Sequence, residues 1–328
     1  MRVKLCSVSL NSMSYGGRDK EASWAEASGL IDSAAHFQPD LFLLPELFLT
    51  GDEKERFSDP EYIEYPGSPM LLKIGAKAAE RHAYIAAPVV YRAEDGVHNT
   101  TVLFDRRGRQ VFTYHKAFPT SSERDHGILA GPLNPPCYDA EFGRIGMAIC
   151  FDANFEPVFA HYRQQKIKLL LFSSYFPGGF ILRQLAWRGH HYVMSSHAQG
   201  YENAIIDDYA RVVATGNMFA RALCWEVNLD SIVLPLYANW GPFPRIRERF
   251  GDQVLVEAFR EEDRMRLVSN MPDKTVDDVV QECGLVRLET MLDDAIARCA
   301  EVRPSSAGSR GSSPRPPRAR PARSQKTT

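Results

Sequence analysis

Short apolar segments that stop abruptly constrain the fold of this chain more than any other feature. Residues 41–44 (LFLL) end at Pro45, residues 142–150 (FGRIGMAIC) end at Cys150, and residues 168–173 (KLLLFS) form a third run. Near-continuous apolar runs that are too short for an ordinary helix are typical of buried strands. Because such strands need cover on each face, they predict a layered protein.

Amphipathic stretches alternate with these strands and give the chain a βαβα order. Helices are expected at residues 19–37, 68–82, 154–165 and 179–190. Ser68 and Pro69 are typical of a helix start. Further strands are expected at residues 3–10, 84–91, 98–105, 110–115, 192–196, 204–207, 211–214 and 224–229, with 98–105 and 110–115 paired as a hairpin. The order predicts an α/β protein in which helices cover strand layers.

The composition excludes several classes of protein. No apolar stretch approaches the roughly 20 residues that span a bilayer, so no membrane partner is expected. Residues 1–10 alternate as a strand and lack the apolar core of a signal peptide, which predicts a cytoplasmic protein. The six cysteines include no CxxC pair, which argues against a zinc ribbon or a disulfide scaffold.

Charge is distributed unevenly along the chain. Residues 303–328 carry seven basic residues and no acidic residue, so the formal net charge of −2 for the whole chain becomes −9 for residues 1–302. The same tail is rich in Ser, Pro and Arg and is expected to be disordered. We therefore expect a main domain (1–235), a C-terminal extension (236–302) and a basic tail (303–328). The extension is expected to carry one helix, at 275–301, and to pack on the domain or on a partner subunit.

Three predicted strands end at a reactive side chain. Glu46 follows Pro45, Lys116 follows the strand at 110–115, and Cys150 closes the run at 142–150. Taken singly, each has an ordinary explanation as a helix-start carboxylate, an edge-strand charge or a small core residue. A cysteine at a strand-to-helix turn is also well placed to react, because nearby backbone N–H groups stabilise a thiolate or an oxyanion.

Together these segments resemble the nitrilase superfamily, the carbon–nitrogen hydrolases. Members of that family carry a Glu in a P-E segment, a Lys in an H-K or R-K segment, and a Cys after G-x-x-I-C. Residues 116–124 (KAFPTSSER) also look like the K-x-x-P-T-x-x-E-R run of nitrilases, and residues 205–212 (IIDDYARV) are similar to the I-x-D-P-x-G-x-V hairpin. The resemblance covers about residues 1–230, in the family's order.

The resemblance implies a four-layer α/β/β/α sandwich with its catalytic domain in residues 1–235. It implies a thiol hydrolase in which Cys150 forms an acyl-enzyme, Glu46 is the general base, and Lys116 with the backbone N–H of Phe151 stabilises the tetrahedral intermediate. A base is needed because a free cysteine has a pKa of about 8.5. Glu123 matches the family's second Glu and would orient Lys116 or help to position the substrate. No cofactor is implied, and a homodimer or larger homo-oligomer is expected.

Departures from the family pattern bear on the substrate. Phe151-Asp152 follow Cys150 where true nitrilases have W-E, and C-x-D is common in the amidase and carbamoylase branches. We therefore expect cleavage of a small amide or N-carbamoyl amine, with conversion of a nitrile to acid and ammonia as the alternative. Phe151, Tyr175 and Phe176 are candidates for substrate binding and favour a medium-sized apolar or aromatic acyl group.

Other features of the sequence suggest different functions. His190, His191 and His197 invite a metal site, but their spacing matches no compact metal motif, and no metal is expected. The basic tail could bind nucleic acid, although the acidic body and the absence of interleaved aromatic residues argue against it. A binding protein that uses the three residues only structurally is the remaining alternative.

Overall fold

The computed structural model of the chain describes residues 1–10, 19–51, 53–198, 202–217 and 219–302. The basic tail predicted at 303–328 lies outside the described residues. The chain divides into two compact units, Met1–Arg287 and Leu288–Thr328, and the described part of the second is the helix α8 (Leu288–Val302). The following paragraphs concern the first unit.

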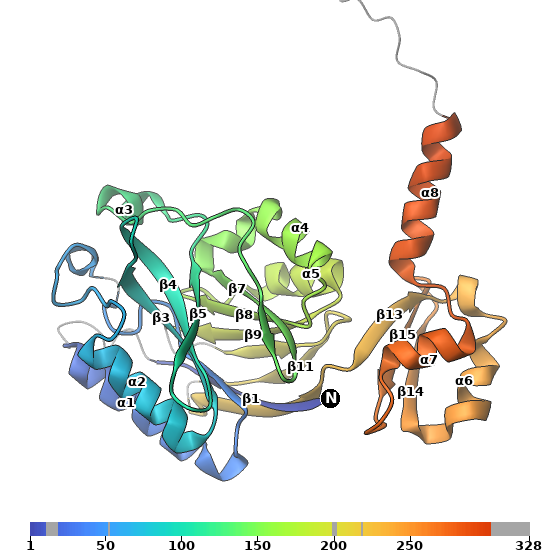
Figure 1. Cartoon of the computed structure of the whole chain (residues 1–328), viewed down its shortest axis with the longest axis horizontal. Coiled ribbons are helices and arrows are strands. Elements are labelled where there is room, and N and C mark those ends of the chain that lie inside the picture. Colours follow the sequence, from blue (N-terminus) through green and yellow to red (C-terminus); the bar gives the residue numbers. More distant parts are fainter. Residues whose placement is uncertain (11–18, 52, 199–201, 218, 303–328) are drawn as a thin grey trace, which may run out of the picture. The chain divides into compact units, whose positions relative to one another are not determined.

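The first sheet has six strands in the order β12-β1-β2-β3-β4-β5. β1, β2 and β3 are parallel to one another, and the other neighbours are antiparallel. Helices α1 (Lys20–Ser33) and α2 (Pro69–Arg81) cover its outer face (Figure 1). The strands are β1 (Arg2–Val8), β2 (Leu41–Leu43), β3 (Tyr84–Arg92), β4 (Val97–Phe104), β5 (Gln110–His115) and β12 (Ala222–Asn228).

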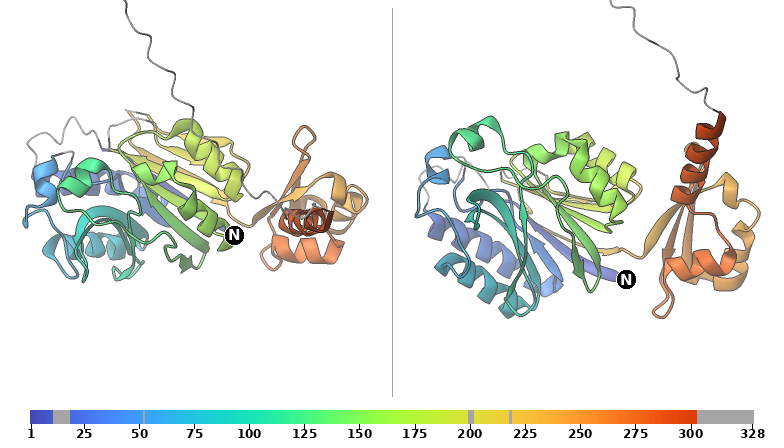
Figure 2. Two further views of the ribbon diagram at one scale, coloured as in Figure 1. Left: turned by 90° about the horizontal axis from the view of Figure 1, so that it is seen from above. Right: turned by 45° about the horizontal axis from the view of Figure 1, so that its top comes forward.

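The second sheet also has six strands, in the order β11-β10-β9-β8-β7-β6. Its three central strands, β7 to β9, are parallel. Helices α4 (Glu156–Gln164) and α5 (Gly179–Gly189) cover its outer face (Figure 2). The strands are β6 (Tyr138–Ala140), β7 (Gly143–Ile149), β8 (Leu169–Ser174), β9 (Tyr192–His197), β10 (Ala204–Ile206) and β11 (Val212–Thr215).

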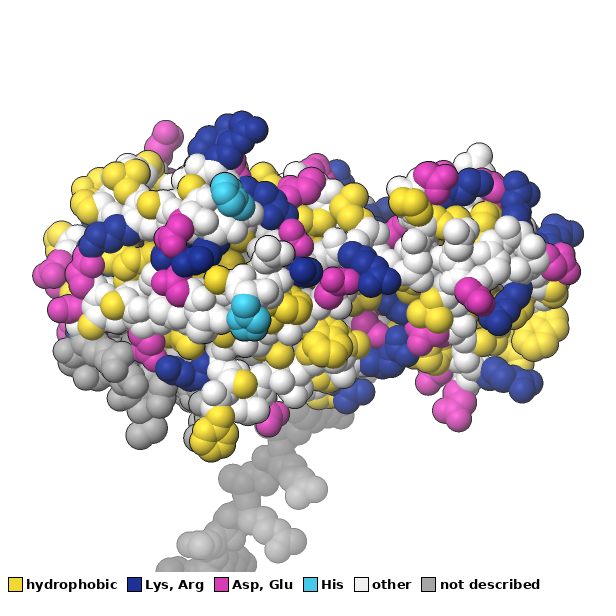
Figure 3. All heavy atoms as spheres, turned by 90° about the horizontal axis from the view of Figure 1, so that it is seen from below, with side chains coloured by type: hydrophobic (Ala, Val, Ile, Leu, Met, Phe, Trp, Pro, Cys, Tyr) yellow, Lys and Arg dark blue, Asp and Glu magenta, His cyan; other side chains and the backbone are white. Residues whose placement is uncertain are grey.

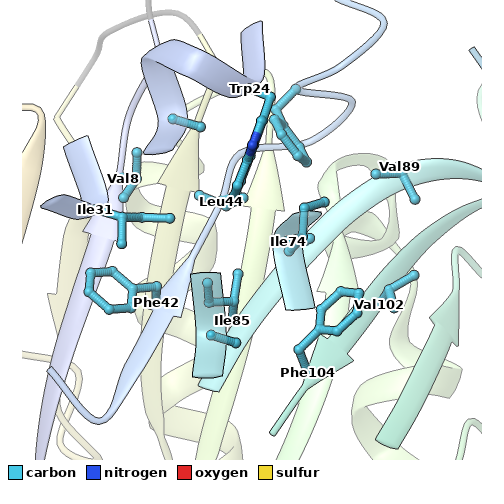
Figure 4. Packing of buried hydrophobic residues seen from close by; sticks show 14 of the residues in the cluster. Val8, Trp24, Ile31, Phe42, Leu44, Ile74, Ile85, Val89, Val102 and Phe104 are labelled. Atoms are coloured by element: carbon cyan, nitrogen blue, oxygen red, sulfur yellow. The ribbon is translucent and has the colours of Figure 1, made fainter. Parts of the chain in front are cut away.

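Apolar side chains fill three layers between these elements. Leu43 and Leu171 belong to the layer between the two sheets, and Phe159 and Phe172 to the layer beneath α4 and α5. The layer beneath α1 and α2 is shown in Figure 4, where Trp24, Ile31, Phe42, Leu44, Ile74, Ile85 and Phe104 converge. Burial on both faces explains why the strands are nearly continuous apolar runs. The predicted α/β/β/α sandwich is confirmed.

A third sheet occupies the region in which the sequence predicted a single helix. Strands β13 (Ser231–Pro235), β14 (Val254–Phe259) and β15 (Arg264–Ser269) are antiparallel in the order β13-β15-β14. Helices α6 (Phe243–Phe250) and α7 (Val276–Cys283) accompany the sheet. The prediction of one helix at 275–301 is wrong, because Gly284 takes the left-handed conformation (φ 65°) and ends α7 before α8 begins.

Arg266 of β15 joins this third sheet to the second one. Its guanidinium is buried and donates to Asp208 Oδ1 at 2.5 Å, to the Tyr192 hydroxyl at 2.6 Å and to Glu257 at 2.8 Å. The Ser231 hydroxyl donates to the other oxygen of Asp208 at 2.6 Å. Asp208 follows β10, so a buried ion pair links residues 58 positions apart in the chain.

One face of the molecule carries charges of both signs (Figure 3). Figure 3 shows basic and acidic side chains interspersed over one face of the molecule. This face therefore offers no basic patch of the kind that binds nucleic acid. In the described part of the chain, no helix combines the length and the apolar character needed to cross a membrane.

Replacing Arg266 by Met should lower the free energy of unfolding by about 3–5 kcal/mol, because it leaves Asp208 buried without its cation. Urea denaturation measures this change. The control is Arg2→Met, which removes an exposed ion pair with Glu226 (2.9 Å) and should cost less than about 1 kcal/mol. Equal effects of the two substitutions would contradict a role for Arg266 in holding the third sheet.

Candidate active site

Cys150 begins a sharp turn at the end of β7. Its φ of 48° lies in the left-handed region, and a short 3₁₀ helix, Cys150–Asn154, follows. A non-glycine residue held there costs on the order of 1–3 kcal/mol, so the surrounding structure must enforce the conformation. The turn places the thiol at the point where β7 ends and the 3₁₀ helix begins.

Asp152 is the residue that holds this turn. Its carboxylate is fully buried and accepts hydrogen bonds from Ile149 N (2.9 Å), Phe118 N (2.8 Å) and the Tyr114 hydroxyl (2.7 Å). Burial raises the pKa of Asp152 to about 6, while Lys116 and these donors favour the carboxylate. The Asp of the C-x-D pattern, Asp152, thus stabilises the turn.

Glu46 lies just beyond β2 and is 2% exposed. Its Oε1 accepts hydrogen bonds from Lys116 Nζ at 2.8 Å and from Asn99 Nδ2 at 2.9 Å. Its Oε2 is buried and has no hydrogen-bond partner of ordinary geometry among the described residues. Burial raises the pKa of Glu46 above its usual value, against the opposing effect of the Lys116 charge. The two oxygens are therefore unequal, one fixed and one available.

Lys116 follows β5 and lies between two carboxylates. Its Nζ is 2.8 Å from Glu46 Oε1 and 2.8 Å from Glu123 Oε2, and the side chain is 1% exposed. Burial alone would lower the pKa of Lys116, but the two carboxylates raise it well above its usual value. The ammonium is therefore a permanent charge beside Cys150.

Glu123 belongs to the short helix α3 (Ser121–Asp125). It forms a capping box with Thr120, whose backbone N–H donates to Glu123 Oε2 at 2.7 Å. Although burial opposes ionisation, Lys116 and a hydrogen bond from Asn99 lower the pKa of Glu123 below its usual value. A local helix start thus fixes the carboxylate that in turn fixes Lys116.

Asn99 is the residue of this cluster that the sequence did not indicate. It is fully buried on β4, and its Nδ2 donates to both Glu46 (2.9 Å) and Glu123 (2.7 Å). The available signal was a run of polar residues, 98–101, inside a strand that is otherwise apolar. All four of these residues are buried, but only Asn99 contacts the ion cluster, because His98 pairs with Asp95 and Thr100 with His115.

The Cys150 thiol completes the cluster. Ser174 and the backbone of Tyr175 make hydrogen bonds with the sulfur. Burial and the nearby Glu46 carboxylate raise the pKa of Cys150 to about 12, although Lys116 acts in the opposite direction. The resting sulfur is therefore protonated, and it needs a base to become a nucleophile. The structure brings Glu46, Lys116, Glu123 and Cys150 to one place.

The predicted aromatic residues have different surroundings. The Phe151 ring is 37% exposed and meets Phe155 edge-on (5.1 Å between ring centres), and Phe155 stacks on Phe118 at 3.8 Å. The Phe176 ring packs edge-on against Phe172 of the core, at 6.0 Å. Tyr175 is partly buried against the apolar cluster of Leu47, Phe57, Ile63, Val90 and Ile128.

The histidines considered as metal ligands have other surroundings. His191 and His197 are buried in β9 or beside it, and burial lowers the pKa of each to about 4. Within the described ranges, no group of three or more His, Cys, Asp or Glu side chains is arranged to hold a metal ion.

Comparison with known proteins gives a consistent picture. The carbon-nitrogen hydrolase family model matches residues 6–232. The bifunctional nitrilase/nitrile hydratase NIT4B of Nicotiana tabacum is 26% identical over 152 residues, which is 41% of this chain and 43% of that protein. The deaminated glutathione amidase of Synechocystis is 26% identical over 162 residues, which is 46% of this chain and 60% of that protein. The matches thus span less than two thirds of these relatives.

Solved structures resemble this fold over most of their length. Nit3 of Saccharomyces cerevisiae, a member of branch 10 of the nitrilase superfamily, aligns with a TM-score of 0.59 and 22% identity over 69% of this chain and 89% of its own. An amidase from Nesterenkonia aligns with a TM-score of 0.60 and 14% identity over 69% of this chain and 90% of its own. At such identities the similarity concerns the fold alone.

Replacing Asn99 by Leu should lower the free energy of unfolding by about 2–4 kcal/mol at pH 7.5, because two buried carboxylates lose a donor. The loss should shrink as the pH falls below the ordinary pKa of a glutamate, toward about pH 3.5. The lowered pKa of Glu123 supplies stability above that ordinary pKa, and the stability is lost as the pH falls through the folded value. Urea denaturation at pH 7.5 and at about pH 3.5 measures both effects.

The matched control is Asn239→Leu. Asn239 is equally buried, but its Nδ2 donates to the backbone carbonyls of Pro235 (2.7 Å) and Val286 (3.0 Å). Its substitution should cost a similar free energy at both pH values. A pH-independent loss for Asn99→Leu as well would contradict its coupling to the carboxylates.

Proposed function

The chain belongs to the carbon–nitrogen hydrolase family, and from that premise we propose that it cleaves a non-peptide carbon–nitrogen bond through a covalent intermediate on Cys150. The proposed substrate is a small amide or N-carbamoyl amine. Glu46 is the general base, Lys116 stabilises the tetrahedral intermediate, and Glu123 positions Lys116.

The unequal environment of the two Glu46 oxygens carries this proposal. Lys116 and Asn99 donate hydrogen bonds to Oε1. Oε2 is buried and has no hydrogen-bond partner of ordinary geometry among the described residues. Cys150 lies close enough to the Glu46 carboxylate to affect its pKa. Burying a carboxylate oxygen without a hydrogen-bond donor costs free energy of folding. Such an oxygen in a site of this kind indicates a role in the reaction, here as a proton acceptor. Its raised pKa makes Glu46 a stronger proton acceptor than an ordinary glutamate.

The first half of the reaction forms a thioester. Glu46 Oε2 accepts the proton of the Cys150 thiol, and the sulfur attacks the carbonyl carbon of the substrate. The negative charge that develops on the carbonyl oxygen is stabilised by Lys116 Nζ and by the backbone N–H of Phe151 at the start of the 3₁₀ helix. The intermediate collapses when the carbon–nitrogen bond breaks and Glu46 returns the proton to the leaving nitrogen.

The second half releases the acyl group. A water molecule takes the place of the departed amine, and Glu46 removes its proton as it attacks the thioester carbonyl. The same donors stabilise the second tetrahedral intermediate. When the carbon–sulfur bond breaks, the proton passes from Glu46 to the sulfur, and the carboxylic acid leaves.

Aromatic rings near the thiol support an apolar or aromatic acyl group. The partly exposed Phe151 ring adjoins the nucleophile, and its edge-on contact with Phe155 fixes its orientation. Tyr175 follows β8, the strand beside β7, and packs on the apolar cluster that contains Leu47, the residue after Glu46. Substrate binding by Phe176 stays a prediction. The homodimer also stays a prediction.

The conversion of a nitrile is the alternative reaction. The similar proteins include a nitrilase/nitrile hydratase and an amidase, so both reactions are candidates. A nitrile carbon attacked by Cys150 would place negative charge on nitrogen instead of oxygen, and the same Lys116 would stabilise it. Reaction with amides and with nitriles side by side distinguishes the two.

The purified chain, mixed with a panel of amides, N-carbamoyl amines and nitriles and quenched in acid, should gain the mass of the acyl group when an amide or carbamoyl amine is present. Peptide mapping should place the adduct on Cys150. Cys150→Ala should form no adduct and lose at least about 10⁴-fold in turnover. Undiminished turnover in that variant would refute the mechanism, and adducts from nitriles alone would establish the alternative.

Cys137→Ala is the matched control. Cys137 is likewise partly buried and free, and burial raises its pKa to about 11. Because it lies outside the ion cluster, its substitution should leave both the adduct and turnover unchanged. Glu46→Gln, which keeps the shape of the side chain but not its basicity, should slow formation of the adduct by at least about 10²-fold.

A further inference from the structure

Two cysteines outside the candidate active site face each other across the first sheet. Cys6 of β1 and Cys224 of β12 are direct partners in the antiparallel ladder, although they are 218 residues apart in the sequence. Their sulfur atoms are 3.1 Å apart, and both are free thiols. The sequence alone did not suggest this pairing, because the two cysteines form no local motif.

The hydrogen-bond pattern shows which kind of ladder position the pair occupies. Ser9 N donates to Arg221 O at one end of the ladder, and Leu229 N donates to Met1 O at the other. Hydrogen-bonded and non-hydrogen-bonded pairs alternate along an antiparallel ladder, so Cys6 and Cys224 form a non-hydrogen-bonded pair. Such pairs have Cα atoms about 4.5 Å apart, within the range of roughly 4.4–6.8 Å that a disulfide spans.

The two thiols differ in access to solvent. Cys6 is buried in the layer beneath α1, whereas Cys224 is only partly buried because β12 is an edge strand. The hydrogen bond between the thiols and burial raise the pKa of Cys6, while the same hydrogen bond lowers the pKa of Cys224. Cys224 is therefore the sulfur that a small oxidant reaches first and the better thiolate.

We propose that Cys6 and Cys224 form an oxidation site that a hydroperoxide converts into a cross-strand disulfide. Cys224 Sγ attacks the peroxide, the O–O bond breaks, and a sulfenic acid forms with release of water or an alcohol. Cys6 Sγ then attacks the Cys224 sulfur, the S–S bond forms, and the hydroxyl leaves as water with the proton of Cys6. Two thiols are oxidised and one peroxide is reduced.

The disulfide would stabilise the sandwich and would make no contact with the candidate active site. It would close a loop of about 218 residues in the unfolded chain. The conformational entropy that a crosslink removes from the unfolded chain increases with the length of the loop. Cys6 faces the layer beneath α1, not the ion cluster around Cys150. The inference is therefore independent of the proposed reaction.

The test uses full-length Cys150→Ala, so that the proposed nucleophile does not consume oxidant. A stoichiometric amount of hydrogen peroxide, quenched with catalase, should lower the intact mass by 2 Da, as expected for the loss of two hydrogens. Digestion without reductant should yield one peptide containing Cys6 joined to Cys224. The melting temperature should rise by about 5 °C or more and return to its starting value after dithiothreitol.

Cys224→Ser in the same background supplies the control. It should show neither the joined peptide nor the rise in melting temperature, and because Cys224 is only partly buried the variant should fold. Cys299→Ser, which removes an exposed cysteine on α8, should behave like its parent. A gain of 16 or 32 Da on Cys224 with Cys6 still free, or no reaction at all, would overturn the proposal.

Discussion

The burial of the Lys116 ammonium is the constraint on which the rest of the site depends. A charge removed from water is tolerated only when it is paired and hydrogen-bonded. Glu46 and Glu123 supply the pairing, and they come from a strand end and from a helix start. Two carboxylates for one ammonium leave the cluster with an excess negative charge, and Asn99 offsets part of it by donating to both.

Hydrogen bonds to a single buried carboxylate also hold the turn at Cys150. Cys150 occupies a left-handed conformation, and Asp152 fixes it by accepting from two backbone groups and from Tyr114. In this way the end of the first sheet holds the end of the second, because Tyr114 lies on β5 and Asp152 follows β7. The site is therefore held by a hydrogen bond that crosses the interface between the sheets, and such fixed contacts are what preorganised stabilisation of charge requires.

Departures from the family's hairpin pattern have a structural explanation in the third sheet. Asp208 stands where the I-x-D-P-x-G-x-V pattern has proline, and its carboxylate receives Arg266 and Ser231. Ala210 stands at the glycine position and keeps the positive φ (63°) that the hairpin requires. The hairpin thus retains its shape while gaining an acceptor for the C-terminal extension.

The sequence determined the layers and the strand-end residues, because short apolar runs, helix periodicity and ordered motifs are local properties. It could not identify Asn99, whose importance arises only when β4 meets two carboxylates that are distant in the chain. Nor did it locate the third sheet, whose strands β13, β14 and β15 pair with one another across separate segments of the chain. Tertiary structure alone decided which Glu46 oxygen is fixed and which is available, since burial and pairing depend on neighbours brought together from separate segments.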